Sequence, residues 1–332
     1  MNSSRINIYS KLSVGRKGFI YTIVAVMFLV IIGSVFFSFS KRDTHESFVS
    51  VEHRVQIMND FIKNLERDSA RASYIAGFRS LIAMEQHVTS TGRPLSNSDA
   101  VFLQAFVNGS IDGTSYVILQ NSTFNDYLLR MQQEVRSQGI LCNISIINVS
   151  LFQTDPWNLR VNYTLEIFVT DSQSTASFRT NKTFIGMVPI VDIRDPLFAM
   201  NTYGRVQRTI KPSNITIFID DAGNKNDTTE FMHHFNNSYY LATGKGPSIL
   251  MRFANNTNDS IYGIESLIDT NELVAQGISV NSRASVVDYL YFNATPALAY
   301  ACNIQNIPSY VQFDYNHLDT YQIQGKLNYT LC

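Results

Sequence analysis

The sequence predicts an α+β protein: an N-terminal transmembrane helix continues into a long helix packed on an antiparallel β-meander, and a mixed α/β C-terminal region follows. Three observations lead to this fold class. Residues 19–40 carry no charge, residues 43–90 repeat apolar side chains at helical spacing without proline, and three alternating apolar segments precede position 192. A long helix followed by neighbouring strands is typical of α+β folds, in which the helix covers the apolar face of the sheet.

The uncharged stretch, residues 19–40, has the length of a membrane span. Its 22 residues would form a helix of roughly 33 Å, which exceeds the ~30 Å hydrocarbon layer. A cleaved secretory signal has a shorter apolar stretch, about 7–15 residues, that ends in small residues. The span is preceded by four basic residues and no acid: Arg5, Lys11, Arg16 and Lys17. The positive-inside rule makes residues 1–18 a cytoplasmic basic leader and predicts a single-pass protein of the cell membrane with residues 41–332 extracellular.

Outside the membrane, residues 41–91 should continue as one long extracellular helix. Apolar or small side chains recur every three or four positions, in a seam like that of a coiled coil. The seam consists of Phe48, Val51, Val55, Met58, Ile62, Leu65, Ser69, Ala72 and Ala76. Thr91-Gly92-Arg93-Pro94 is expected to end the helix, because glycine and proline are helix stop signals.

Residues 92–192 are predicted to hold two short helices and the meander. The first helix covers about 98–107, with Gly109 after its end, and the second covers 126–138. Asn125 is the expected N-cap of the second helix, because an Asn side chain accepts hydrogen bonds from free backbone N–H groups.

Three strands are predicted near 140–152, 159–170 and 176–190, where apolar and polar residues alternate. Turn-forming residues separate them. Asn148 breaks this alternation, because its side chain faces outward only if a β-bulge lies near Ile146–Ile147.

An approximate domain boundary is expected near 192–205, and residues 193–332 are expected to form the mixed α+β C-terminal region. Strand-like segments occur at 214–219 and 286–292, with loops rich in Asn and Asp between them.

Thirteen N-x-S/T acceptor patterns lie beyond the span, whereas about five are expected by chance from the Asn, Ser and Thr content. This excess favours an N-glycosylated surface over an Asn-rich protein with accidental patterns. The acceptors are Asn108, Asn121, Asn143, Asn148, Asn162, Asn181, Asn214, Asn226, Asn236, Asn255, Asn258, Asn293 and Asn328. Asn143, Asn162 and Asn181 fall on the polar face of the predicted strands.

The net charge of −1 argues against nucleic-acid binding. The chain beyond residue 18 carries 22 basic against 27 acidic residues and no basic stripe, whereas nucleic-acid binding requires clustered Lys and Arg. Cys142, Cys302 and Cys332 allow one disulfide, in any of three pairings, and leave one thiol over.

No motif in the sequence indicates an active site, and we assign no catalytic residue, cofactor or metal. His233-His234 could bind a metal, but adjacent His side chains project in different directions, which favours a surface pair. An oxygen-rich stretch could hold calcium, although its spacing favours a solvated turn; it comprises Asp220, Asp221, Asn224, Asn226 and Asp227. Gly244-Lys245-Gly246 lacks the spacing of a phosphate-binding loop and is interpreted as a turn. An extracellular hydrolase is therefore the least favoured hypothesis.

The junction Arg16-Lys17-Gly18-Phe19, followed by the apolar helix, resembles the class III signal of type IV pilin-like proteins. In that family a prepilin peptidase cuts after the glycine, which implies cleavage between Gly18 and Phe19. The resemblance also implies a helix that leaves the bilayer to pack against copies of itself or other pilin-like subunits. The family's usual Glu at the fifth mature position is Ile23 here, a departure that bears on filament assembly more than on processing.

Four longer segments look like parts of an uncharacterised group of archaeal surface proteins with pilin-like N-termini: residues 69–88, 238–253, 263–269 and 286–292. That resemblance covers most of the chain and implies a surface location but no activity. Two hypotheses follow: a non-enzymatic, N-glycosylated pilin-like subunit, or an uncleaved stand-alone envelope protein or adhesin that binds an unknown partner. In both, the lipid bilayer surrounds residues 19–40.

Overall fold

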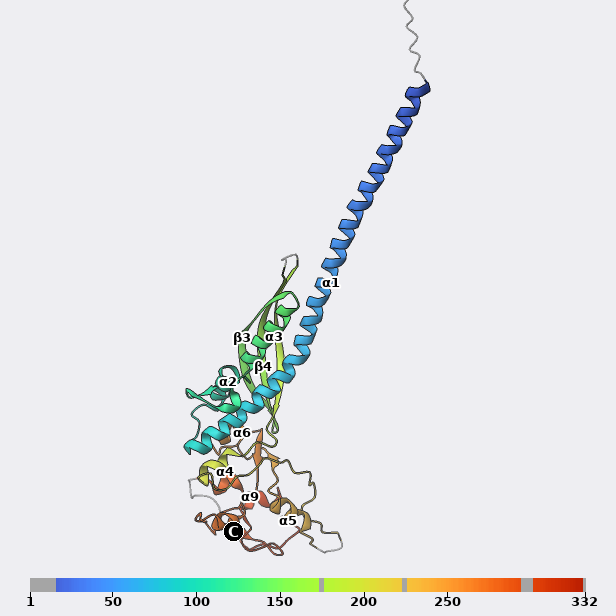
Figure 1. Cartoon of the computed structure of the whole chain (residues 1–332). Helices are drawn as coiled ribbons and strands as arrows, with labels where there is room; N and C mark the ends of the chain where they lie inside the picture. The colour runs from blue at the N-terminus through green and yellow to red at the C-terminus, as the bar shows by residue number, and fades with distance from the viewer. Residues whose placement is uncertain (1–15, 173–175, 223–225, 294–300, 331–332) are drawn as a thin grey trace, which may run out of the picture.

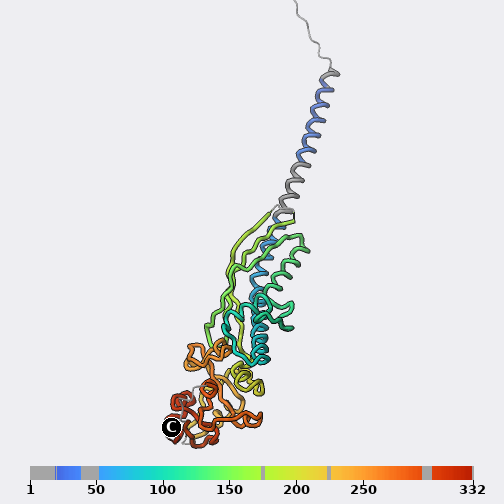
Figure 2. Tube along the Cα trace, turned by 90° about the vertical axis from the view of Figure 1, so that its left-hand side faces the viewer, coloured from blue at the N-terminus to red at the C-terminus, as the bar shows by residue number. Residues whose placement is uncertain are grey.

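The computed structural model describes residues 16–172, 176–222, 226–293 and 301–330, and for 16–18, 20 and 39–51 it describes the backbone alone. Figure 1 shows a long helix, α1, whose N-terminal half projects away from the rest of the chain. The C-terminal half of α1 lies along a sheet, and the C-terminal region lies beyond the far end of that sheet, as the rotated view in Figure 2 also shows.

Helix α1 spans Arg16–Thr91 without interruption, 76 residues in all, or about 114 Å at 1.5 Å per residue. The two helical segments expected from the sequence are therefore one helix. It ends at the expected place, where the N–H of Gly92, at a φ of 64°, donates to the carbonyl of Val88 at 2.8 Å. A left-handed residue after the last turn is a common helix stop, and glycine adopts that conformation without strain.

Two shorter helices follow. Helix α2 spans Ser98–Asn108 and ends before a left-handed glycine, as the sequence predicted. Three small elements connect it to the next helix: β1 (Ser110–Ile111), β2 (Thr114–Ser115) and the 3-10 turn η1 (Val117–Leu119). Helix α3 spans Phe124–Ser137, and its N-cap is Thr123 rather than Asn125. The prediction was wrong because Thr123 and Asp126 form a capping box, which satisfies two backbone N–H groups at once and starts the helix earlier.

The antiparallel meander contains three strands in sequence order: β3 (Ile140–Asp155), β4 (Asn158–Asp171) and β5 (Ser177–Pro189). All three predicted strands are confirmed. A register shift between Ile146 and Asn148 marks the expected β-bulge, after which Asn148 pairs with Thr164. Alternate residues of β4 from Leu159 to Val169 are buried, so one face of the sheet forms part of the core.

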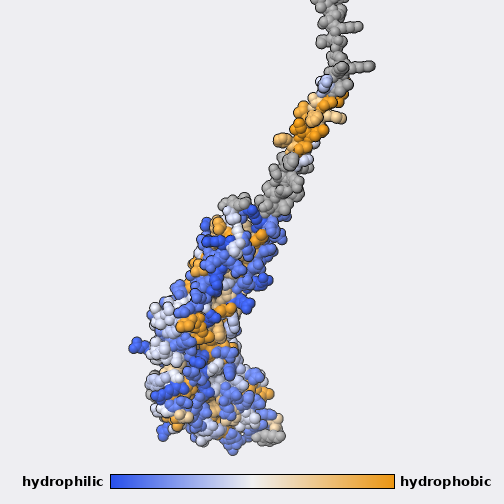
Figure 3. Space-filling view, viewed as in Figure 1, coloured by the Kyte–Doolittle hydropathy of each residue, from blue (hydrophilic) through white to orange (hydrophobic). Residues whose placement is uncertain are grey.

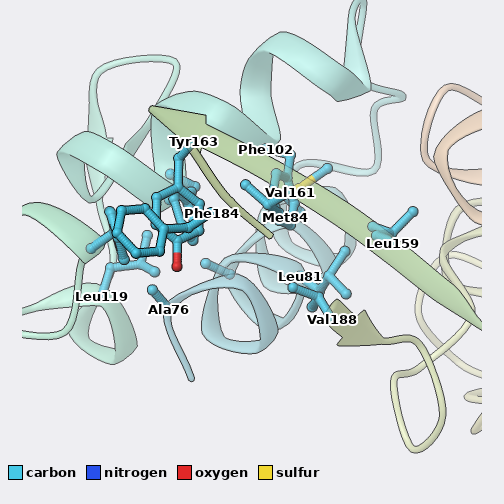
Figure 4. Packing of buried hydrophobic residues seen from close by; sticks show 14 of the residues in the cluster. Ala76, Leu81, Met84, Phe102, Leu119, Leu159, Val161, Tyr163, Phe184 and Val188 are labelled. Atoms are coloured by element: carbon cyan, nitrogen blue, oxygen red, sulfur yellow. The ribbon is translucent and has the colours of Figure 1, made fainter. Parts of the chain in front are cut away.

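Helices α1 and α3 cover this apolar face of the sheet. Tyr163 of β4 packs edge-on against Phe124 of α3, with ring centroids 4.6 Å apart. Tyr163 also stacks on Phe184 of β5 at a centroid distance of 5.5 Å, and both residues are labelled in Figure 4. Helix α1 approaches the sheet closely at Gly186, where a Cβ atom would lie 2.0 Å from Ser73 Oγ. A side chain at this position would therefore force the helix away from the strand.

The apolar seam of α1 is packed inside the molecule from its fourth position onward. Its buried members are Met58, Leu65, Ser69 and Ala76. Val55, about one turn before Met58, is 49% exposed, and the side chains of Phe48 and Val51 lie outside the described residues. The buried part of the seam stabilises the single chain and is not available for a coiled coil with another one.

The C-terminal region consists of short elements joined by loops. Its helices are α4 (Pro196–Asn201), α5 (Thr229–Asn236), α6 (Ile249–Phe253), α7 (Thr270–Ala275), α8 (Asp288–Tyr291) and α9 (Tyr315–Leu318). Its strands form two antiparallel pairs, β6 (Leu241–Thr243) with β7 (Gly263–Glu265) and β8 (Cys302–Asn303) with β9 (Gln312–Phe313). Phe313 and Tyr321 belong to a core of this region, whereas Tyr240 and Phe253 belong to the core under the sheet. The core under the sheet thus contains residues from both sides of the boundary expected near 192–205.

Two strand predictions in the C-terminal region are wrong. Residues 214–219 form no strand, and the N–H of Phe218 donates to the side chain of Gln322 at 3.1 Å instead of pairing in a ladder. Residues 286–292 begin extended but turn into α8 at Asp288. Phe218 and Ile219 of the first segment and Val286 and Val287 of the second are buried in the C-terminal core rather than under a larger sheet.

Candidate functional site

The N-terminal part of α1 exposes an apolar surface. Residues Tyr21–Ser38, 18 in all, have a mean hydropathy of 2.3, and none of them is buried. Figure 3 shows this apolar band in orange on the projecting helix, apart from the largely hydrophilic body. Apolar area costs about 25 cal/mol per Å² in water, so such a helix requires lipid or protein around it. By length and composition, this helix is apolar enough to cross a membrane.

The predicted peptidase site lies at the start of this helix. Gly18 and Phe19 both fall within α1, and the Phe19 side chain is 64% exposed. Ile23, one turn later, is 45% exposed. Residues 1–15 of the expected basic leader lie outside the described residues.

None of the thirteen acceptor Asn residues is buried. Asn162 and Asn226 are half-buried, and the others are exposed. Glycan attachment requires an accessible Asn side chain, so all these positions are compatible with it.

Four acceptors share the face of the sheet that the helices leave uncovered: Asn143, Asn148, Asn162 and Asn181. The β-bulge places Asn148 on this face, because a strand without the extra residue would turn its side chain toward the core. The same face carries Phe152, Ile185 and Met187, which are 42–50% exposed. Asn162 pairs directly with Ile185, so a glycan on Asn162 would lie next to this apolar patch.

A buried cluster of charged side chains joins the C-terminal region to the core under the sheet. The guanidinium of Arg252 contacts Asp195 Oδ2 at 2.5 Å and Asp288 Oδ2 at 2.9 Å, and all three side chains are fully buried. Tyr240 Oη donates to Asp195 Oδ2 at 2.8 Å. Burial raises the pKa of Asp288 to about 6, although Arg252 opposes the shift. Because no part of the cluster reaches solvent, we assign it a structural role.

Sequence reasoning did not identify this cluster. Charged residues are mostly exposed in proteins, and no motif distinguishes Arg252 or Asp288 from surface residues. The one usable signal was Asp195 before Pro196, a typical helix start, and Asp195 does cap α4 by accepting from the N–H of Leu197 at 2.9 Å.

A second buried polar group surrounds His317. Its Nδ1 lies 2.7 Å from Asp314 Oδ2, and its Nε2 lies 2.9 Å from Tyr289 Oη and 3.4 Å from Glu265 Oε2. Burial lowers the pKa of His317, but hydrogen bonds to Asp314 and Glu265 outweigh this effect and raise it to about 9. His317 is therefore cationic at neutral pH. An Asp–His pair can serve as a catalytic base, but His317 is only 3% exposed, and a substrate would not reach it.

The adjacent histidines lie in different surroundings. His234 is buried, with Nδ1 3.1 Å from Ser213 Oγ, and burial together with the nearby His233 lowers its pKa to about 4. His233 is exposed and contacts Asn237. Within the described ranges, no group of three or more His, Cys, Asp or Glu side chains is placed to hold a metal ion.

The two ends of the oxygen-rich stretch pair with each other. Asp220 and Asp227 pair through their backbones at 2.8 and 3.1 Å, and the Asp221 carboxylate lies 3.9 Å from Nζ of Lys326. Asn224 lies outside the described residues. The described carboxylates thus engage backbone groups and a lysine.

The remaining sequence candidates have structural explanations. Residues 244–246 form a bend, in which Lys245 Nζ donates to the carbonyl of Asn316 at 2.9 Å. Cys302 is disulfide-bonded, whereas Cys142 is a free thiol whose pKa is raised by burial to about 12. Cys332 lies outside the described residues. Pairings that include Cys142 are therefore excluded.

The described residues thus have three distinctive features: an exposed apolar helix, acceptor Asn residues on the surface and buried ionic clusters. Comparison of the chain with family models, with curated proteins and with solved structures found no match.

Proposed function

We propose that this chain is a membrane-anchored, N-glycosylated surface protein of the pilin-like kind, with a structural rather than an enzymatic role. The observation that carries the proposal is the unburied apolar segment Tyr21–Ser38, at the start of a helix whose other half packs on the sheet. One half of α1 is thus used by the fold, and the other half remains for lipid or for other copies of the helix.

Three further features support an extracellular location for residues 41–332. The basic residues before the apolar segment favour a cytoplasmic N-terminus. The acceptor Asn residues lie at the surface, where glycans can be attached. Cys302 is disulfide-bonded, and disulfides persist in oxidising environments outside the cytosol.

The decisive experiment is sequencing the N-terminus of the protein purified from its own membranes. The proposal expects Phe19 as the first residue, and expects Gly18→Val to retain the leader. Gly33→Val is the matched control, because Gly33 lies in the same apolar helix with no atom near its Cβ position. A wild-type protein that still begins with Met1 would remove the pilin-like part of the proposal.

A second experiment tests the orientation. Protease added to intact cells should degrade residues 41–332, because they are expected outside the membrane. Survival of this part in intact cells, with degradation only after lysis, would contradict the extracellular location.

The alternative is an uncleaved, stand-alone envelope protein or adhesin. It is favoured by Ile23, which occupies the position of the Glu usual in pilin-like proteins and supplies no charge there. Electron microscopy of cells that overproduce the protein separates the two functions. Filaments that contain this chain would exclude the stand-alone function.

A further inference from the structure

A cleft of about 520 Å³ lies between α1 and α3, apart from the features described above. Residues three and four positions apart on α1 line one side, and Tyr127 and Arg130 of α3 line the other. The turn 121–123, which leads into α3, supplies the rest of the lining. The volume falls in the range of small-molecule sites.

Three arginines give this cleft its positive charge: Arg71, Arg79 and Arg130. Arg79 donates to Ser122 Oγ, and Arg130 Nη1 donates to the Asn121 carbonyl at 2.7 Å, so both arginines contact neutral acceptors. In the part of the chain that the structure describes, none of the three forms an ion pair. The acid in the lining, Asp68, contacts Arg67 outside the cleft at 3.9 Å.

The α1 wall of the cleft is also partly apolar. Ile75 lies between Arg71 and Arg79 at spacings of four, so all three share one stripe of the helix. Ile75 is 39% exposed, and the Tyr127 ring lines the opposite wall. A ligand that fits here must present an anionic group to the arginines and C–H groups to these side chains.

We propose that this cleft binds a carboxylated sugar. A guanidinium matches a carboxylate with two parallel hydrogen bonds, and apolar and aromatic side chains pack on the C–H face of a sugar ring. The hydroxyl of Ser122, which accepts from Arg79, can bond one of its hydroxyl groups. Asn121 is also an exposed acceptor, so the sugar comes from a glycan attached at the cleft or from another molecule.

The test is calorimetric titration of the full-length protein in detergent micelles with glucuronate, glucose and sulfate. Glucuronate should bind saturably, and glucose should not. Arg71→Gln and Arg130→Gln should each weaken glucuronate binding by roughly tenfold, the effect of one charge-assisted hydrogen bond. Arg136→Gln is the matched control, because it removes the same charge from an exposed position of α3 that does not line the cleft, and it should leave the affinity unchanged.

Two results would overturn the proposal: no saturable glucuronate binding in either the wild type or Asn121→Gly, or binding that Arg71→Gln does not change. Sulfate binding as tight as glucuronate binding would also overturn it, because it would indicate a general anion site. Asn121→Gly identifies the source of the sugar without straining the backbone, since residue 121 has a φ of 53°. Tighter glucuronate binding by this variant would support the attached glycan as the occupant, and unchanged binding would support an external sugar.

Discussion

Replacing Arg252 with methionine should destabilise the protein by about 3–5 kcal/mol at pH 7.5, because it leaves buried carboxylates without their cation. Asp195 and Asp288 are both fully buried, and the guanidinium lies 2.5 Å from one and 2.9 Å from the other. Methionine retains most of the apolar stem, so the loss reports the charge rather than a cavity.

The magnitude follows from the way a buried carboxylate avoids an unpaired charge. It binds a proton, which costs about 1.36 kcal/mol for each pH unit above its ordinary pKa near 4. At pH 7.5 this sets a ceiling of about 5 kcal/mol for each carboxylate, and at pH 5 the ceiling falls to about 1.5 kcal/mol. The destabilisation by Arg252→Met should therefore shrink strongly between pH 7.5 and pH 5.

Urea unfolding of the full-length protein in micelles, followed by tryptophan fluorescence, measures the effect. Trp157 is the single tryptophan, and its carbonyl accepts from the N–H of Ile190 at 2.9 Å, so its signal reports the core under the sheet. Arg283→Met is the control, because Arg283 is exposed and its loss should cost no more than about 0.5 kcal/mol.

Two outcomes would refute the reasoning: a loss below about 1 kcal/mol at pH 7.5, or an equal loss at pH 5. Either would mean that groups other than Arg252 compensate the two carboxylates. Adding Asp288→Asn to Arg252→Met should recover part of the stability, because it removes one of the unpaired charges.

Three further predictions concern pH, packing and glycosylation. Stability should fall between pH 6.5 and pH 9, because the rise in pH removes the proton that stabilises His317. Below pH 6.5, protonation of buried His234 lowers stability, but protonation of buried Asp288 opposes this loss. The loss above pH 6.5 is worth on the order of 3 kcal/mol, and urea midpoints between pH 6.5 and pH 9 should show it. Gly186→Ala should cost about 1–3 kcal/mol in the same assay, and Ser73→Gly should restore stability by removing the clash. Asn148→Gln should lower the intact mass by one glycan and change stability by less than about 0.5 kcal/mol.

Each of these predictions has a clear contrary result. If the His317→Gln variant still lost stability as the pH rose above 6.5, another group would be responsible for that loss. If Gly186→Ala were as stable as the wild type, the helix could move away from the strand without cost. An unchanged mass for Asn148→Gln would mean that this acceptor carries no glycan.

The sequence was sufficient where structure depends on neighbouring residues. The apolar stretch and the spacing of the seam predicted one half of α1 each, and Gly92 ends that helix as expected. Even the β-bulge at Asn148 followed from a break in the alternation of apolar residues. The N-cap of α3 was missed, although the Thr123–Asp126 capping box was visible in the sequence.

The tertiary structure alone decided what lies beside what. Residues 286–292 are rich in Val and aromatic residues like a strand, yet α8 begins within them, because Asp288 pairs with Arg252 in a core built from distant segments. The arginines of the cleft also meet only because α3 packs beside α1. Hydrophobic periodicity records the one face that a segment buries, but it carries no information on which other segment covers that face. Ionic clusters and clefts depend on that choice, so they appear only when the packed chain is known.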